Sequence, residues 1–250
     1  MKLFRQIREN LLAEGRRAKY LKYAFGEILL VVIGILIALQ VNNWNNARTD
    51  RKREIKYLSN IILDLKKDIA SLDYLIAFRN GRLISDQELI QQINEPPIKE
   101  LTAVTKNVVN SLMEERFSPN NSTFNELESS GNLSLISNDS IKVYLLELNE
   151  IYKMNEFGIA HEEFDYREYI SRPLASYIKL DKMYPIFTGE KTAEEQNITA
   201  KDFNGLFKSQ EYQNGLVILA SMHNAFISAY ESIKSKSNRV IEMIEKDIET

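Results

Sequence analysis

The feature that most constrains the fold is a short apolar stretch near the start of the chain, from Ile28 to Leu39. At about 1.5 Å per residue it covers about 18 Å, whereas the hydrocarbon layer of a membrane is roughly 30 Å thick. A spanning helix needs about 20 residues, so it must include neighbours on both sides. Tyr23 and Trp44 are residue types that favour the two membrane interfaces. We predict a transmembrane signal anchor over residues 23–45.

Two alternatives to an anchor are a cleaved signal peptide and a buried helix of a soluble protein. An apolar core of this length fits a signal peptide. However, the possible cleavage site Ala38-Leu39-Gln40 places glutamine where a small residue is expected. Basic residues on both sides of the apolar stretch argue against a buried helix, so the uncleaved anchor is the preferred interpretation.

The basic residues also predict the orientation of the anchor. Residues 1–22 hold seven lysines and arginines against two glutamates, and residues 48–56 hold five against two acidic residues. The larger basic excess favours a cytoplasmic N-terminus. Because Leu3, Phe4, Ile7 and Leu11 share one helical face, we predict that residues 1–22 form a basic amphipathic cytoplasmic segment on the inner leaflet. The alternative is an unstructured basic head.

The rest of the chain is acidic. Residues 57–250 hold 20 lysines and arginines against 30 aspartates and glutamates, a net charge of −10. Such a domain repels the phosphate backbone, so we expect no nucleic-acid binding. Without cysteine there is no disulfide and no thiolate metal site. Nine glycines and five prolines in 250 residues offer little turn punctuation, which predicts a helical protein.

One face of the predicted span is marked by small and polar residues. On a helical wheel this stripe contains Glu27, Gly34, Ala38, Val41 and Asn45. Small residues four apart let two helix backbones approach closely, and polar groups bond between helices. We predict that the stripe mediates self-association or partner binding. In the alternative, Glu27 only reaches the headgroups and the glycine has no special role.

A long helix is predicted from residue 55 to about residue 93, ending before Pro96-Pro97. Its apolar seam alternates steps of three and four residues: Ile55, Leu58, Ile62, Leu65, Ile69, Leu72 and Ile76. A seam of this kind fits a coiled coil between chains or one face of an intramolecular bundle. Since other helices follow in the chain, the bundle is preferred.

Further helices follow at shorter spacing. We predict a helix over 100–115, a short helix that Thr123 and Glu126 begin as a capping box, and a left-handed Gly131 at its end. Asn138 then caps a helix that runs to about Gly158 and buries Ile141, Leu145, Leu148 and Tyr152.

The C-terminal third is predicted to be mostly helical. Residues 159–183 form a helix kinked or restarted at Pro173, and residues 183–199 form a loop. A last helix runs from Asn204 or Ser209 to Ile248, antiparallel to the first long helix. Its buried face is predicted to contain Leu219, His223, Phe226, Tyr230, Ile233, Val240 and Ile244.

The sequence offers little chemistry. His161 and Asp165 are four residues apart on a helix, but a zinc site needs a third ligand, so we predict no metal. His223 is predicted to be a hydrogen-bonded core residue. Phosphate-binding, dinucleotide and nucleophile-elbow motifs are absent, so neither a cofactor nor an enzyme activity is expected. Four tyrosines (Tyr152, Tyr166, Tyr169 and Tyr177) either line a ligand cavity or, as we prefer, pack in the helical core.

Two stretches resemble the signatures of an uncharacterised family of membrane-anchored bacterial proteins, common in Bacteroidota (domain of unknown function 6090). They are KYLKYAFGEILLVVIGILIALQVNNWN at 19–45 and STFNELESSGNLSLISN at 122–138. The resemblance implies a single-pass protein of the bacterial inner membrane with a helical periplasmic domain. It implies no activity and no catalytic residues.

The sequence therefore predicts an all-α protein with a transmembrane helix, followed by an extracytoplasmic helical domain over residues 46–250 that has long first and last helices. The expected function is that of a membrane-tethered interaction or scaffold module, which binds a protein partner or another copy of itself. The alternative is a sensory or ligand-binding bundle that acts through a membrane partner. A bare apolar groove along the bundle would favour protein partners, whereas a tyrosine-lined pocket with converging charge would favour a ligand.

Overall fold

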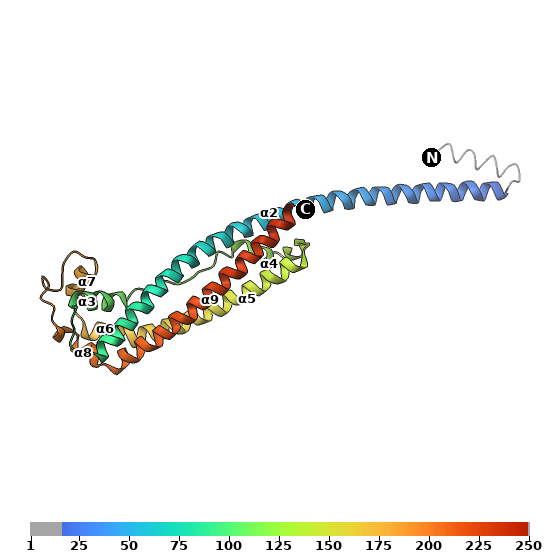
Figure 1. Cartoon of the computed structure of the whole chain (residues 1–250). Helices are drawn as coiled ribbons and strands as arrows, with labels where there is room; N and C mark the ends of the chain where they lie inside the picture. The colour runs from blue at the N-terminus through green and yellow to red at the C-terminus, as the bar shows by residue number, and fades with distance from the viewer. Residues whose placement is uncertain (1–16, 250) are drawn as a thin grey trace. The chain divides into compact units, whose positions relative to one another are not determined.

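The computed structural model describes residues 17–249, and every regular element in this part of the chain is helical (Figure 1). The α-helices are α2 (Arg17–Asn94), α3 (Leu101–Asn110), α4 (Ser122–Ser129), α5 (Asp139–Tyr166), α6 (Arg172–Tyr177), α7 (Leu180–Phe187), α8 (Asn204–Lys208) and α9 (Gln210–Glu249). Short 3-10 helices, η1 (Asn132–Leu135) and η3 (Ala200–Phe203), and a π-helical turn, η2 (Arg167–Ser171), lie between them. The all-α prediction is confirmed, whereas most of the amphipathic segment predicted over residues 1–22 lies outside the described residues.

The chain divides into two units, residues 1–56 and residues 57–250. In the first unit, α2 carries the apolar stretch with its side chains in the open: Ile28 is 62% exposed and Leu36 is 58% exposed. Among the described residues, one helix, Ala24–Asn94, is long and apolar enough to cross a membrane, and none of its most apolar window is buried. By composition, this stretch is either a membrane anchor or a signal sequence.

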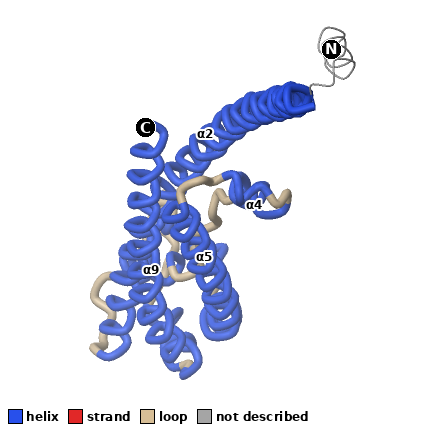
Figure 2. Tube along the Cα trace, turned by 90° about the vertical axis from the view of Figure 1, so that its right-hand side faces the viewer, coloured by secondary structure: helices blue, strands red, loops and turns tan. Residues whose placement is uncertain are grey.

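In the second unit, α2, α5 and α9 lie lengthwise beside one another (Figures 1 and 2). Lys66 on α2 forms a salt bridge of 3.2 Å with Glu245 near the end of α9. Further along α2, Asp73 pairs with Lys234, which lies earlier on α9. Because the pairing moves backwards along α9, the two long helices are antiparallel, as predicted.

The buried face of α2 is centred one residue away from the predicted seam. From residue 57 onward its buried positions are Leu58, Ile61, Leu65, Asp68, Leu72, Leu75, Arg79, Arg82, Ser85, Asp86 and Leu89. Leu58, Leu65 and Leu72 belong to both sets, whereas Ile62, Ile69 and Ile76 are only partly buried at the flank. The buried face includes four charged residues, of which Asp68 and Arg82 are brought in by the shift, whereas Arg79 and Asp86 lie on the continuation of the predicted seam.

Two hydrophobic cores lie one after the other in this unit. The first contains Leu72 of α2, Leu148 of α5 and Ile233 of α9. The second contains Leu89 of α2 and Leu216 of α9, together with the short C-terminal helices around Phe203. The predicted inward residues of α5 and α9 are all buried.

Two predicted segments differ from the structure. The helix predicted over 100–115 ends at Asn110, because Arg82 and the Tyr166 hydroxyl donate hydrogen bonds to the carbonyls of the next two residues, Ser111 and Leu112. The loop predicted over 183–199 begins later, because α7 extends to Phe187 and buries Met183 and Ile186, three residues apart, in the second core.

The helix ends around η1 are largely as predicted. Gly131 is left-handed with φ of 71°, and the Asn138 side chain accepts from the backbone N–H groups of Ser140 and Ile141. Helix α5, however, continues past Gly158 to Tyr166. A Cβ at Gly158 would lie 3.4 Å from the Phe226 ring, so this glycine allows close helix packing and does not end the helix.

The predicted interruption at Pro173 is confirmed. Proline has no N–H, and its ring clashes with the carbonyl four residues earlier, here that of Tyr169. The chain responds with η2, in which the Arg172 N–H donates to the Arg167 carbonyl, and α6 then begins. Gly215 of α9 packs against this turn, where a Cβ would lie 2.7 Å from the carbonyl oxygen of Tyr169.

Gly215→Ala is therefore expected to lower the free energy of unfolding by about 1–3 kcal/mol, because the obstacle to the new methyl group is backbone. Gly81→Ala is the matched control, since Gly81 is exposed on α2 with nothing within 4 Å of its Cβ position. That change should stabilise by about 0.5–1 kcal/mol. Urea unfolding of the full chain in detergent, followed by circular dichroism, measures both, and equal effects would contradict the packing argument.

Candidate functional site

A buried ionic network lies between the two hydrophobic cores. Arg79 donates to both carboxylate oxygens of Glu162, at 2.6 and 2.9 Å. The guanidinium stacks on the Phe226 ring, 4.1 Å from its centroid, and donates to the Tyr230 hydroxyl at 3.3 Å. The Arg79 and Glu162 side chains are only 2% and 8% exposed, so this pair joins α2 to α5 out of contact with bulk water.

The network continues through His223 to a second carboxylate. His223 Nδ1 lies 3.2 Å from Arg79 Nη1, and His223 Nε2 lies 3.3 Å from Asp86 Oδ2. Asp86 is fully buried, with Arg82 Nη2 at 3.9 Å. The prediction that His223 is a hydrogen-bonded core residue is confirmed. Sequence reasoning missed its partners, although the three-and-four spacing of α2 continues from Leu75 through Arg79 and Arg82.

The network has no room for a substrate. A cavity of about 20 Å³ opens beside Arg82, Glu114, Glu162 and His223, which is enough for a single water molecule. Burial raises the pKa of the Glu114 carboxyl, against the opposing charge of Arg116. Because its strongest pair is bidentate and fixed in direction, the network serves to set the register of α2 against α5 and α9.

Four buried or partly buried tyrosines of the bundle predict a loss of stability at high pH. Burial raises the pKa of Tyr166 from 10.0 to about 12, and it also raises the pKa values of Tyr152, Tyr212 and Tyr230. The unfolded chain releases these protons near pH 10, so stability is fully present below that pH and falls as the pH rises from 10 to 12. Urea midpoints measured with tyrosinate absorbance should show this fall, and Tyr166→Phe should make it shallower.

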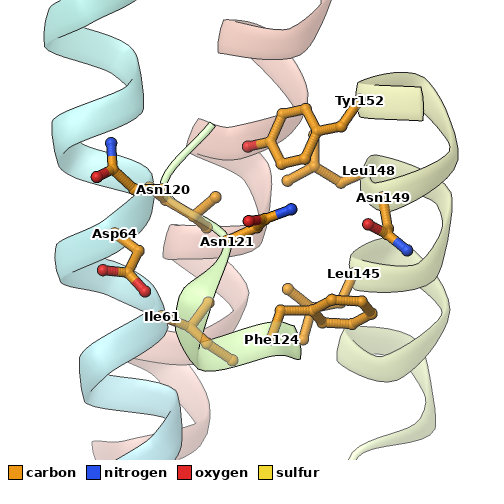
Figure 3. A pocket seen from close by; sticks show the side chains of 10 residues that line it. Ile61, Asp64, Asn120, Asn121, Phe124, Leu145, Leu148, Asn149 and Tyr152 are labelled. Atoms are coloured by element: carbon orange, nitrogen blue, oxygen red, sulfur yellow. The ribbon is translucent and has the colours of Figure 1, made fainter. Parts of the chain in front are cut away.

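Two carboxylates of α2 bind the start of the family-like stretch at 122–138 and the residues that lead into it. Figure 3 shows one of them, Asp64, beside Asn120 and Asn121. Asp68, fully buried, accepts from the backbone N–H of Asn120 at 2.7 Å, from its side-chain amide at 2.8 Å, and from the Tyr152 hydroxyl at 2.8 Å. Asp64 accepts from the Thr123 hydroxyl at 2.6 Å. The two aspartates therefore hold the segment that leads into α4.

The capping box predicted at Thr123 is wrong for the same reason. The Thr123 hydroxyl donates to Asp64, and Glu126 accepts from the Tyr57 hydroxyl at 2.9 Å. Both side chains are thus used in tertiary contacts, and α4 begins without a side-chain cap. The cavity beside them, lined by Asp64, Asn121 and Asn149, has about 20 Å³ and again holds no more than a water molecule.

A much larger groove runs between α5 and α9 on the outside of the bundle. It has about 470 Å³ and is lined mostly by apolar or small side chains, among them Met154, Gly158, Met222, Ala225, Phe226 and Ala229. On its α5 edge, Met154 is 74% exposed and Phe157 is 70% exposed. This is the bare apolar groove that the sequence analysis associated with a protein partner.

A second hollow, of about 440 Å³, is polar. Its lining includes Phe164, Glu168, Tyr169, Arg172, Tyr177 and Glu211. Glu168 accepts from Arg172 at 2.8 Å and from Arg167 at 3.2 Å, and these hydrogen bonds lower its pKa. Of the four tyrosines considered, Tyr169 and Tyr177 line this hollow, whereas Tyr152 and Tyr166 bind Asp68 and Leu112 elsewhere.

The structure also describes the residues of the predicted stripe and His161, one of the two residues of the possible metal pair. Glu27, Gly34, Ala38, Val41 and Asn45 all lie on the continuous helix α2, and Val41 is 58% exposed. His161 packs edge-on against Phe157, with ring centroids 4.7 Å apart. Across the residues that the structure describes, no group of three or more histidine, aspartate or glutamate side chains is placed to hold a metal ion.

These features define an all-α protein with an exposed apolar N-terminal helix and a helical bundle that carries an open apolar groove. Residues 27–167, more than half of the chain, match a family of unknown function, DUF6090, and the chain belongs to this family. The match includes the exposed apolar stretch of α2, the Asp68 contacts and all of α5. No curated protein matches the chain, and no solved structure matches it.

Proposed function

We propose that the protein is a membrane-tethered interaction module, whose extracytoplasmic bundle binds another protein chain in the α5/α9 groove. The groove carries the proposal. Large apolar patches on soluble surfaces mark interaction sites, and hot spots favour aromatic side chains set in well-packed pockets. Phe157 and Met154, both more than two-thirds exposed, lie beside small residues that leave space for a partner.

The exposed apolar stretch of α2 supports the tether. In water these side chains would form a continuous apolar surface, whereas in a bilayer they face lipid. We place the span at 23–45 in the bacterial inner membrane, with residues 1–22 cytoplasmic and residues 46–250 periplasmic. A cysteine introduced at the exposed Asn238 is unique in this chain, and a membrane-impermeant maleimide should label it in intact spheroplasts. A mature N-terminus near residue 41, or extraction by carbonate, would contradict the tether.

The binding function is tested by gentle detergent purification of the tagged full chain after crosslinking in cells. We expect a bound chain, either a second copy or a different protein, that is lost in Phe157→Glu. Val143→Glu is the matched control, because Val143 lies on the same helix and is 50% exposed, away from the groove. Recovery of the monomer alone from wild type and control would overturn the proposal.

The stripe on the predicted span is a separate part of this proposal. Gly34 has nothing within 4 Å of its Cβ position, so leucine fits there without disturbing α2 itself. If the stripe brings two helices together, Gly34→Leu should reduce crosslinking between copies in membranes. Unchanged crosslinking would show that the stripe is not an association surface, and the groove would remain the proposed interaction site.

A ligand-binding bundle is the second candidate, and the polar hollow at Tyr169, Arg172 and Tyr177 favours it. Arg172 supplies a charge at the wall, beside aromatic surface. However, Glu168 already pairs with Arg172, so an anionic ligand would have to compete with a carboxylate of the chain itself. This internal pairing is why the groove ranks first.

A further inference from the structure

We propose that the occupant of the α5/α9 groove is a second copy of this chain, bound face to face about a two-fold axis. The inference rests on the proposed function and names its partner. In a two-fold interface the same surface is used twice, so a projecting group must lie beside a recess that fits it. The groove and its edge have this arrangement.

The projecting group and the recess lie at one level of the bundle. Phe157 projects from α5 and is 70% exposed, and the next residue is Gly158 in the groove wall. Phe226 of α9 packs against Gly158, since a Cβ there would lie 3.4 Å from its ring. Ala225 and Ala229 flank Phe226 on α9 and leave the groove open. A two-fold axis parallel to α5 therefore brings Phe157 of each copy to the recess of the other.

The recess is large enough for the groups that would enter it. A cavity of about 150 Å³ accepts a benzene ring. The groove, at about 470 Å³, accepts the Phe157 ring together with the Met154 thioether of a second copy. Both copies then run in the same direction.

The distribution of charge favours the face that carries the groove for contact between copies. Residues 57–250 carry a net charge of −10, with 20 basic against 30 acidic residues, so two copies repel each other over most of their surfaces. Helix α9, in contrast, has no aspartate, glutamate, lysine or arginine from Tyr212 to Tyr230. The groove lining likewise contains no carboxylate, lysine or arginine, and His161 is its one titratable side chain. A groove built for an unlike, basic partner would have an acidic lining.

Site-specific crosslinking of the full chain tests this geometry, because introduced cysteines are unique. Two differently tagged copies, one Phe157→Cys and one Ala225→Cys, are coexpressed in the Gly34→Leu background and treated with a short bismaleimide. We expect crosslinked heterodimers. The matched pair of Val143→Cys with Ala225→Cys should give at least tenfold less product, since residue 143 lies about 21 Å along α5 from residue 157.

Two substitutions check the same contact without cysteines. Phe157→Glu adds charge at the projecting group, and Ala225→Phe fills the recess. In the same Gly34→Leu background, each should convert the dimer to monomer by light scattering in detergent, with an unchanged urea midpoint showing that the bundle is folded. No preferred crosslink, or a dimer that survives both substitutions, overturns the second-copy inference. If Ala225→Cys instead captures a different chain, the inference fails while the proposed function stands; if it captures nothing, both fail.

Discussion

Replacing Arg79 with leucine is expected to lower the free energy of unfolding by about 3–5 kcal/mol, because it strands a buried carboxylate. Glu162 has Arg79 as its bidentate donor, at 2.6 and 2.9 Å, and its side chain is 8% exposed. With Arg79 gone, His223 and the Tyr230 hydroxyl also lose a hydrogen-bond partner. A loss of this size is a large part of the total stability of a domain.

The control for Arg79→Leu is Arg239→Leu. Arg239 pairs with Glu242 on α9 at 3.1 Å, but these side chains are 60% and 66% exposed, so the loss should be below about 1 kcal/mol. The double change Arg79→Met with Glu162→Met should recover most of the stability lost in Arg79→Leu, since it removes the stranded charge. Urea unfolding by circular dichroism measures all three. Equal losses for Arg79→Leu and Arg239→Leu would show that the network does not set the bundle's stability.

The network and the groove share one side chain. Phe226 lines the groove, and Arg79 stacks on the same ring at 4.1 Å. Since Glu162 of α5 fixes Arg79, the ionic network also fixes the Phe226 ring that lines the groove. Burying an ionic network costs desolvation free energy, so the network adds little net stability. We infer that it instead fixes the arrangement of α5 and α9 on which the groove depends.

Much of the fold could be predicted from helical periodicity and from proline, glycine and asparagine signals. The end of α2 before Pro96, the cap at Asn138 and the buried face of α9 all depend on local chemistry that the sequence displays. The centre of the α2 face could not be predicted in this way. Ile62 and Ile61 are equally apolar, and the choice between them depends on where the neighbouring helices lie.

The candidate site was harder to predict, because its charged residues are buried and its apolar residues are exposed. This is the reverse of the pattern from which helices and their buried faces are predicted. Arg79, Asp86 and Glu162 are charged residues that the structure buries. Arg79 and Glu162 are paired with each other, more than 70 residues apart in the chain, and Asp86 is paired with His223. Met154 and Phe157 fall outside the buried face of α5. From sequence alone, such apolar residues are indistinguishable from scattered surface exposure until the groove beside them is known.

Asp68→Leu is expected to lower the free energy of unfolding by about 3 kcal/mol or more, because three hydrogen bonds to a buried carboxylate are lost together. The Asn120 backbone and side-chain amides and the Tyr152 hydroxyl donate to Asp68, which is fully buried. Leucine has the same branched skeleton as aspartate but accepts no hydrogen bond, so these donors remain unpaired in the first core. The effect should be concentrated where Asn120 leads into α4.

Hydrogen exchange distinguishes this local effect from general loosening. In Asp68→Leu, amides from 118 to 138 should exchange faster than those of α9, because Asp68 binds Asn120 at the start of this stretch, while Asp64 and Tyr57 bind it further along. Asp73→Leu is the matched control on the same helix: its side chain is 53% exposed in the pair with Lys234, and its loss should cost less than about 1 kcal/mol. If 118–138 stays as protected in Asp68→Leu as in the control, the attachment of this stretch comes from the apolar contacts of Phe124 and Leu127 rather than from the aspartates.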